Sequence, residues 1–289
     1  MTKTIRIAFI DWWGGWNPTQ NFFTELLRHS YNLVVLDSSQ AQQADLVFYS
    51  IFGDHHHIID PNKLIHFSGE SHWHTHGLCR ITCNQDTTDR NICLPLWSMF
   101  LDWFGVTSYG NPDWLIPLEY ICERPYYSNT KAVSGNIFAL VGNLNPDSLR
   151  TKVLATLNNC GIKNLAGKIT NTYRAKHDIF STSLLTIAME NKIQPGYLTE
   201  KIVQSYAAGT VPIVLDIEKI NVPYINKEAI LNVDSDELFK AKDPNEYFRD
   251  LVSDALKNGV YQHPLFINNK IPKEYSPLSI LNQLETFIK

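Results

Sequence analysis

The chain has 289 residues, of which 44% are hydrophobic and 19% are charged. This is the composition of an ordinary globular protein, and the length is sufficient for two domains with separate cores. The net charge of −4 provides no general attraction for nucleic acid, and no apolar stretch is long enough to span a bilayer.

The five cysteines show no regular spacing, which indicates reduced thiols and a cytoplasmic location. The first residues lead directly into a strand-like run, so we expect no secretory signal peptide. Any contact with the inner membrane is therefore expected to be peripheral.

The first part of the chain predicts a parallel α/β sheet. Strand-like apolar runs span residues 5–10, 33–36, 46–52 and 64–67, and a helix is predicted to begin at Pro18. In parallel sheets, the loops after the strands hold ligands. Two loops have suitable residues: the aromatic loop 12–16 after the first strand, and Ser68-Gly69-Glu70 after the fourth. Residues 80–127 show no clear periodicity.

A second α/β pattern follows the polar segment 128–135, which we predict to separate a domain of residues 1–133 from a domain of residues 134–275. Strands are predicted at 137–141, 184–189 and 211–215, and helices at 146–157 and over most of 234–257. A closing helix within residues 276–289 is expected to return to the first domain.

Residues 196–215 predict a turn, a short helix and a buried strand. We expect Thr199 to cap the helix with its side-chain oxygen. If the helix reaches back to Tyr197, then Tyr197, Glu200 and Lys201 lie on one side of it. A helix N-terminus favours phosphate, Lys201 adds a positive charge, and Glu200 can accept hydrogen bonds from a ribose. The alternative is a capped surface helix with a Glu-Lys pair.

The same stretch carries a longer motif. Glu190-Asn191 and the following residues fit the string E-N-x(5)-Y-x-T-E-K-[IL]-x(3)-Y-x-A-G-T-V-P-I. This string resembles the donor-site signature of the α1,3/4-fucosyltransferases, glycosyltransferase family 10. Weaker matches run from the first strand to about Val233. The resemblance implies a soluble, bacterial-type enzyme with the GT-B fold, in which two Rossmann-like α/β domains face a central cleft.

The resemblance also implies roles for individual residues. Glu70 matches the family's catalytic base, and Arg150 matches the arginine that contacts the donor pyrophosphate. The remaining donor-binding residues that it implies are Asn191, Tyr197, Glu200 and Lys201. Glu190 is expected to orient the loop.

Aromatic residues and histidines are the candidates for the acceptor side. Trp12 and Trp13 have two interpretations, stacking on a sugar or partial burial in the core. His72 and Trp73 follow Glu70 closely and are expected to line the acceptor site. Seven of the ten histidines fall between His55 and His76. Zinc binding is the alternative for this cluster, but the spacing fits no standard site, so no metal is expected.

The function implied is inverting, metal-independent transfer of L-fucose from GDP-fucose to a GlcNAc-containing oligosaccharide or lipopolysaccharide glycan, in α1,3 or α1,4 linkage. No cofactor is required. Two segments depart from the family: Ser181-Thr182-Ser183 lacks its Tyr-Lys-Phe, and Val214-Leu215-Asp216 replaces its Tyr-Trp-Gly. Two alternatives remain: another nucleotide-sugar donor with the same fold, or a glycan- or nucleotide-binding module without turnover.

Overall fold

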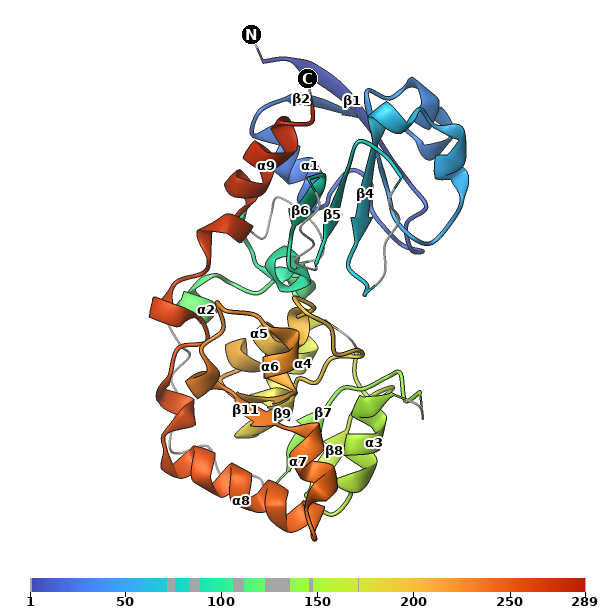
Figure 1. Cartoon of the computed structure of the whole chain (residues 1–289). Coiled ribbons are helices and arrows are strands. Elements are labelled where there is room, and N and C mark those ends of the chain that lie inside the picture. Colours follow the sequence, from blue (N-terminus) through green and yellow to red (C-terminus); the bar gives the residue numbers. More distant parts are fainter. Residues whose placement is uncertain are drawn as a thin grey trace. The chain divides into compact units, whose positions relative to one another are not determined.

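The computed structural model describes residues 2–71, 76–83, 89–105, 112–122, 136–145, 148–170 and 172–288. The chain divides into two compact units (Figure 1). The first comprises Met1–Pro112 and Lys273–Lys289, and the second comprises Asp113–Pro272. The segment in which we predicted the domain boundary, residues 128–135, lies outside the described residues.

The first unit is built on a six-stranded parallel sheet with the order β2-β1-β3-β4-β5-β6. Its strands are β1 (Thr4–Ile10), β2 (Asn32–Val35), β3 (Leu46–Tyr49), β4 (Leu64–Ser68), β5 (Cys79–Thr82) and β6 (Asn91–Cys93). The chain places β2 on one side of β1 and all later strands on the other. The strand order therefore reverses between β1 and β3.

The second unit has a five-stranded parallel sheet with the order β11-β10-β9-β7-β8. Its strands are β7 (Ile137–Ala139), β8 (Ile162–Asn164), β9 (Leu185–Ile187), β10 (Val211–Leu215) and β11 (Leu231–Val233). Here the order reverses between β7 and β9. The two parallel sheets confirm the prediction of two α/β domains.

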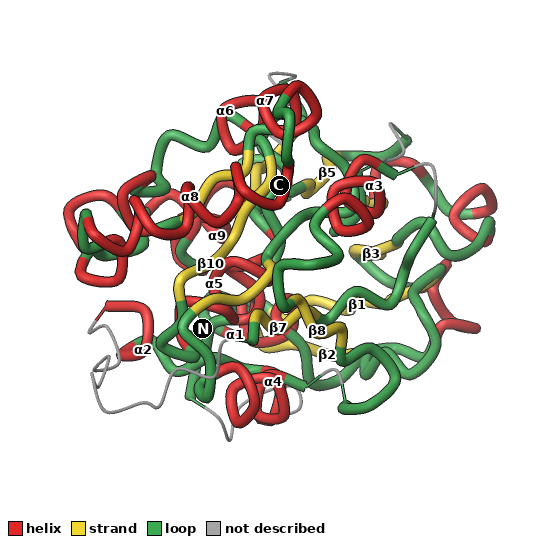
Figure 2. Tube along the Cα trace, turned by 90° about the horizontal axis from the view of Figure 1, so that it is seen from below, coloured by secondary structure: helices red, strands yellow, loops and turns green. Residues whose placement is uncertain are grey.

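Helices and loops connect the strands, as the red and green segments of Figure 2 show. The helices are α1 (Phe22–Arg28), α2 (Glu119–Cys122), α3 (Leu149–Thr156), α4 (Tyr173–Phe180), α5 (Glu200–Ala207), α6 (Ile217–Ile220), α7 (Ser235–Lys240), α8 (Pro244–Lys257) and α9 (Pro277–Glu285). The last of these, α9, packs against α1 and β6 and so belongs to the first unit (Figure 1). No helix in the described ranges has the length and hydropathy needed to cross a membrane.

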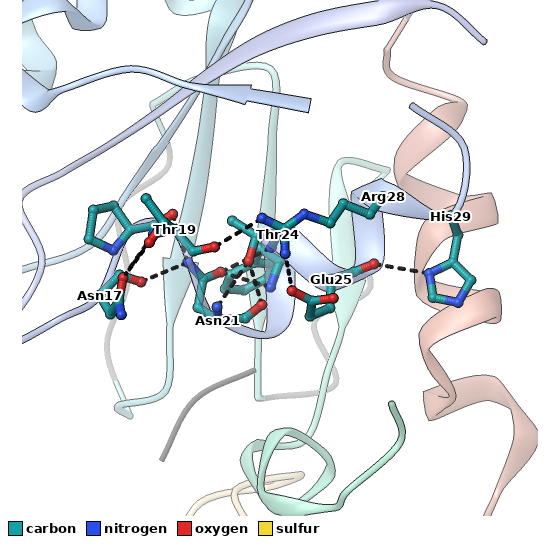
Figure 3. Close-up of polar contacts among 9 residues, drawn as sticks. Asn17, Thr19, Asn21, Thr24, Glu25, Arg28 and His29 are labelled. Carbon is teal, nitrogen blue, oxygen red and sulfur yellow. Dashed lines mark hydrogen bonds and ion pairs between the residues drawn. The ribbon is translucent and has the colours of Figure 1, made fainter. Parts of the chain in front are cut away.

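Helix α1 shows how local chemistry sets a helix boundary (Figure 3). The prediction that this helix begins at Pro18 is wrong, because Asn21 is its N-cap. The Asn21 side chain accepts hydrogen bonds from the backbone of Phe23 and Thr24, both at 3.0 Å. The Thr24 hydroxyl in turn accepts from the Asn21 backbone at 2.9 Å. These reciprocal hydrogen bonds satisfy backbone amides at the start of the helix, and they explain why it begins after Asn21 and not at Pro18.

The two units have cores of different character. In the first, aromatic rings from β1, β3, β4 and α1 pack together: Phe9 stacks on Phe48 with centroids 5.3 Å apart, and Phe23 lies edge-on to Phe67 at 5.1 Å. In the second, aliphatic side chains from the central strands and from α3 and α7 form most of the core, joined by Phe248 of α8. Each sheet is thus buried on its own, and its loops are left to carry polar side chains.

Candidate functional site

The polar residues of the donor-site motif converge where the strand order of the second sheet reverses. Glu190 and Asn191 follow β9, Asn143 follows β7, and Arg150 lies in the first turn of α3. In open α/β sheets, ligands bind in the crevice outside the carboxyl ends of the strands at such a reversal. The topology therefore places these side chains where a ligand is expected.

Glu190 is the centre of this cluster. Its carboxylate is fully buried and accepts hydrogen bonds from the Thr199 backbone at 2.7 Å and from the Thr199 hydroxyl at 2.8 Å. The Lys201 ammonium donates to the other carboxylate oxygen at 2.7 Å. Glu190 thereby fastens the end of β9 to the N-terminus of α5. Glu190 was predicted to orient the loop before α5, and these hydrogen bonds are the contacts through which it can do so.

The structure differs from two expectations for α5. Thr199 is the N-cap residue, but its side chain makes no capping hydrogen bond to the helix. Its hydroxyl donates to Glu190, and its oxygen accepts from the Lys201 ammonium at 2.6 Å. A charged donor makes a stronger hydrogen bond than a neutral helix amide, so the ammonium takes the place of the local cap. The helix begins at Glu200, so Tyr197 lies before it and is buried.

Charged groups on α5 interact strongly with one another. Burial alone would lower the pKa of Lys201, but Glu190 and Glu200 raise it above the ordinary value. Burial alone would raise the pKa of Glu200, but Lys201 and Lys176 lower it. Both side chains are therefore charged at neutral pH. Lys201 keeps 22% of its side-chain surface exposed.

Arg150 is held from three sides. Its guanidinium donates to the Asn143 carbonyl at 2.7 Å, to the Met189 carbonyl at 3.4 Å and to the side-chain oxygen of Asn191. Burial lowers its pKa, and the attraction of Glu190 offsets part of this effect. The buried Nε has no partner among the described residues. A guanidinium fixed in this way suits a phosphate group, which presents oxygens in matching geometry.

A further cation, Lys176 of α4, was not singled out in the sequence. Its ammonium is buried and donates to the Gln204 side chain at 2.6 Å. The two line a pocket of about 20 Å³ together with Lys201 and Ser205. Burial lowers the pKa of Lys176 to about 8. The spacing of Tyr173, Lys176 and Phe180, which are all buried on α4, was the sequence signal that could have revealed it.

In the first unit, the structure places the predicted acceptor-side residues in different settings. Glu70 is exposed just after β4, and its backbone donates to the Ser68 hydroxyl at 3.2 Å. Trp12 is half-buried and donates to the Phe48 carbonyl at 3.1 Å. Trp13 is 40% exposed. His72 and Trp73 lie outside the described residues.

Two histidines of the first unit contact Asp11. His55 and His56 each bring Nδ1 to 2.8 Å from one of the Asp11 carboxylate oxygens. Burial acts to raise the pKa of Asp11, but the hydrogen bonds from both histidines outweigh it and lower that pKa. Within the described residues, no three His, Cys, Asp or Glu side chains form a group that could hold a metal ion. Metal independence stays a prediction.

Two family models match the chain. Residues 130–259 match glycosyltransferase family 10 (fucosyltransferase), C-terminal part. Residues 7–100 match the N-terminal domain of the alpha-(1,3)-fucosyltransferase FucT. No curated protein sequence matches significantly.

Solved structures show the same fold. The crystal structure of an alpha1,3-fucosyltransferase with GDP is 19% identical, with a TM-score of 0.64 over 99% of this chain and 90% of that one. The structure of an alpha1,3-fucosyltransferase with GDP-fucose is 18% identical, with a TM-score of 0.66 over 100% of this chain and 91% of that one. These similarities confirm the predicted GT-B fold class.

The buried Lys176 generates a prediction about stability and pH. Its pKa is lowered on folding from 10.5 to about 8, so the unfolded chain binds this proton more tightly. Below pH 8 the charged lysine opposes folding, and this cost disappears as the pH rises towards 10.5. It amounts to about 3 kcal/mol at roughly 1.4 kcal/mol per pKa unit. Lys176→Met should therefore lack this rise in stability.

Urea unfolding between pH 7 and 10.5 measures the effect. The free energy of unfolding of the wild type should increase relative to that of Lys176→Met across this range. Lys163→Met, which removes an exposed lysine of β8, is the matched control and should follow the wild type. Parallel pH curves for the wild type and Lys176→Met would contradict the assignment of a lowered pKa.

Proposed function

Since this chain belongs to glycosyltransferase family 10, the fucosyltransferases, we propose that it transfers L-fucose from GDP-fucose to a hydroxyl of a GlcNAc-containing glycan. The product linkage is α1,3 or α1,4. The observation that carries the proposal is the cluster of Arg150, Lys201 and Glu190 at the reversal point of the second sheet. The solved alpha1,3-fucosyltransferase structures with GDP and with GDP-fucose support the choice of donor.

The donor site is proposed to act mainly through charge. Arg150 and Lys201 bind the diphosphate, since both are cations held in place by neighbouring acceptors. Asn191 and Tyr197 contact the nucleotide sugar from the loop between β9 and α5, and Glu200 accepts hydrogen bonds from a ribose or sugar hydroxyl. Thr199, bound to Glu190, keeps this loop in register with the helix.

Glu70 is proposed as the catalytic base. Its carboxylate takes the proton from the acceptor hydroxyl while that oxygen attacks the anomeric carbon of fucose. The bond from this carbon to the β-phosphate oxygen breaks, and GDP leaves with the electron pair. Attack opposite the leaving group converts the β-linked donor into an α-linked product. GDP is a good leaving group, so the reaction requires one base and no general acid.

The acceptor is an oligosaccharide or a lipopolysaccharide glycan, and Trp12, Trp13, His72 and Trp73 are proposed to face it. We place the enzyme in the cytoplasm, with peripheral contact at the inner membrane where such glycans are assembled. No cofactor takes part in this mechanism.

The donor is tested by calorimetric titration with GDP and UDP, followed by product-release assays with GDP-fucose and GDP-mannose. Binding of GDP but not UDP, with GDP release only from GDP-fucose in the presence of N-acetyllactosamine, is the expected result. GDP release from GDP-mannose alone would show that the enzyme uses another donor. GDP binding without GDP release from either donor would indicate a nucleotide-binding module without turnover.

The phosphate contacts predict the behaviour of two variants. Lys201→Ala and Arg150→Ala should each weaken GDP binding by about 1.5–3 kcal/mol, the usual contribution of a hydrogen bond to a charged group. Titration calorimetry measures this directly. Lys192→Ala, which removes an exposed charge next to Asn191, is the control and should bind GDP normally. If both site variants keep the affinity of the wild type, the donor site has been misassigned.

Metal independence predicts the result of chelation. Dialysis against a strong chelator should leave most of the transfer activity, because Arg150 and Lys201 already stabilise the charge that develops on GDP. Activity is measured before dialysis, after it, and after adding Mg²⁺, Mn²⁺ or Zn²⁺. Complete loss of activity that only a divalent ion restores would revive the metal hypothesis for the histidine cluster.

The assignment of the base predicts a separation of catalysis from binding. Glu70→Gln preserves the size and polarity of the side chain but cannot accept the proton. Turnover should fall by about 10²- to 10⁴-fold, the usual contribution of general-base catalysis, while GDP affinity stays unchanged. Glu274→Gln, a change at another exposed glutamate of the first unit, is the control. Retention of more than about a tenth of wild-type turnover in Glu70→Gln would place the base elsewhere.

A further inference from the structure

The first unit contains a pocket of about 670 Å³ at the point where its own strand order reverses. The pocket is lined by residues that follow β1, β2 and β3. Its volume is in the range of roughly 300–1,000 Å³ that is typical of small-molecule sites. The fold rule that locates the donor site in the second unit thus locates a second candidate ligand site in the first.

One wall of the pocket is aromatic. Trp12 and Trp16 stack with ring centroids 4.1 Å apart, and Trp13 lies against Trp16 at 4.7 Å. Trp12 and Trp16 are half-buried, whereas Trp13 is 40% exposed. Trp12 packs against Phe9 and Phe67 and also lines the pocket, so core burial and ligand contact both apply to it. Trp13 offers the more exposed apolar ring to a ligand.

His55 is one of several exposed polar residues that line this pocket. Its side chain is 81% exposed, and its Nδ1 lies 2.8 Å from the Asp11 carboxylate. A carboxylate with a lowered pKa accepts hydrogen bonds, so Nδ1 carries the proton. Nε2 is then the ring nitrogen available to a ligand. His57, although adjacent, makes no such bond to Asp11 among the described residues and does not line the pocket.

Asp11 is positioned with unusual precision. Its φ of 57° lies in the left-handed region, and its two oxygens also accept from the backbone of His55 at 3.0 Å and of His56 at 2.9 Å. A Cβ at Gly53 would come within 2.5 Å of the Asp11 carboxylate, so glycine is needed there. Such a conformation persists only where surrounding contacts impose it, and this is often at a functional site.

The charges of the pocket restrict its ligand. Asp11 and Asp37 line it, and no lysine or arginine is among the described residues that do. Ser38 and Gln42 contribute further polar groups. An anionic ligand would meet the exposed Asp37 carboxylate, with the buried Asp11 carboxylate behind His55 and no lysine or arginine among the described lining residues to compensate. A hydroxyl group, in contrast, can donate to a carboxylate and can both donate to and accept from Ser38 and Gln42. The ligand that fits has one apolar face and several hydroxyls, which describes a neutral sugar.

We propose that this pocket binds one neutral sugar ring of the glycan acceptor. The apolar face of the ring lies on Trp13, and a hydroxyl hydrogen-bonds Nε2 of His55, which Asp11 holds in position. The proposal rests on the proposed function, since it assumes a glycan acceptor, and it adds a defined subsite with a charge preference to it.

The test compares glycan and nucleotide binding in the same variants. N-acetyllactosamine is titrated by saturation-transfer NMR, and GDP by calorimetry. Trp13→Ala and His55→Ala should each weaken disaccharide binding about tenfold or more, as expected on losing a central contact, with GDP affinity unchanged. Phe239→Ala, an exposed aromatic of the second unit, and His57→Ala are the matched controls and should bind both ligands normally.

The positioning role of Asp11 is tested by the ¹⁵N chemical shifts of the His55 ring nitrogens. In the wild type, these shifts should report the Nδ1–H tautomer, and in Asp11→Asn they should report a mixture of tautomers. Wild-type shifts in Asp11→Asn would remove Asp11 as the positioning residue.

The outcomes separate this proposal from the proposed function. If disaccharide binding depends on Trp13 but the protein transfers no fucose, the proposed sugar pocket is supported and the proposed reaction is contradicted. Fucose transfer with disaccharide binding that is independent of Trp13 overturns the pocket alone. A loss of GDP affinity in Trp13→Ala would assign the pocket to the nucleotide, and absence of disaccharide binding by the wild type would also overturn the proposal.

Discussion

The contact between the buried Glu190 carboxylate and the Lys201 ammonium is the interaction on which the second unit's candidate site depends. It joins the end of β9 to the start of α5 and holds both charges before any ligand is present. Removing one member of a buried pair usually costs about 3–5 kcal/mol, because the other charge is left unpaired. The partial exposure of Lys201 puts this contact towards the lower end. Thr199 hydrogen-bonds the same carboxylate, and the Arg150 guanidinium is attracted to it.

Both units have a buried carboxylate at the point where the strand order reverses. Asp11 follows β1 and Glu190 follows β9, and each is a carboxylate without exposed surface that binds groups from a later segment of the chain. In each case one partner keeps exposed surface: His55 with 81% of its side chain and Lys201 with 22%. A buried carboxylate that fixes an exposed cationic or titratable group is a way to preorganise a site, since the group needs no reordering when the ligand arrives.

Continuous apolar runs made much of the fold predictable. Val211–Leu215 is buried along its whole length and reads as a strand from its residues alone. Strand β5 is equally buried, but its polar residues Arg80 and Thr82 hide it from a search for apolar runs. The Thr82 hydroxyl donates a 2.9 Å hydrogen bond to Asn91, a partner that only the folded sheet brings near. The motif at Tyr197–Lys201 located the polar cluster around Glu190. Local capping rules failed at Thr199, because they do not include charged side chains such as Glu190 and Lys201, which bind its hydroxyl in the folded chain.

The charge balance of the donor-side cluster bears on how the proposed reaction is accelerated. Among the described residues, Arg150, Lys176 and Lys201 face Glu190 and Glu200, which leaves a positive surplus. When the bond between fucose and the diphosphate breaks, the leaving group gains negative charge. The attraction of these fixed cations therefore increases from the bound donor to the transition state, and only such an increase raises the rate. The same attraction is strongest for free GDP, so a site that speeds bond breaking in this way also slows release of the nucleotide.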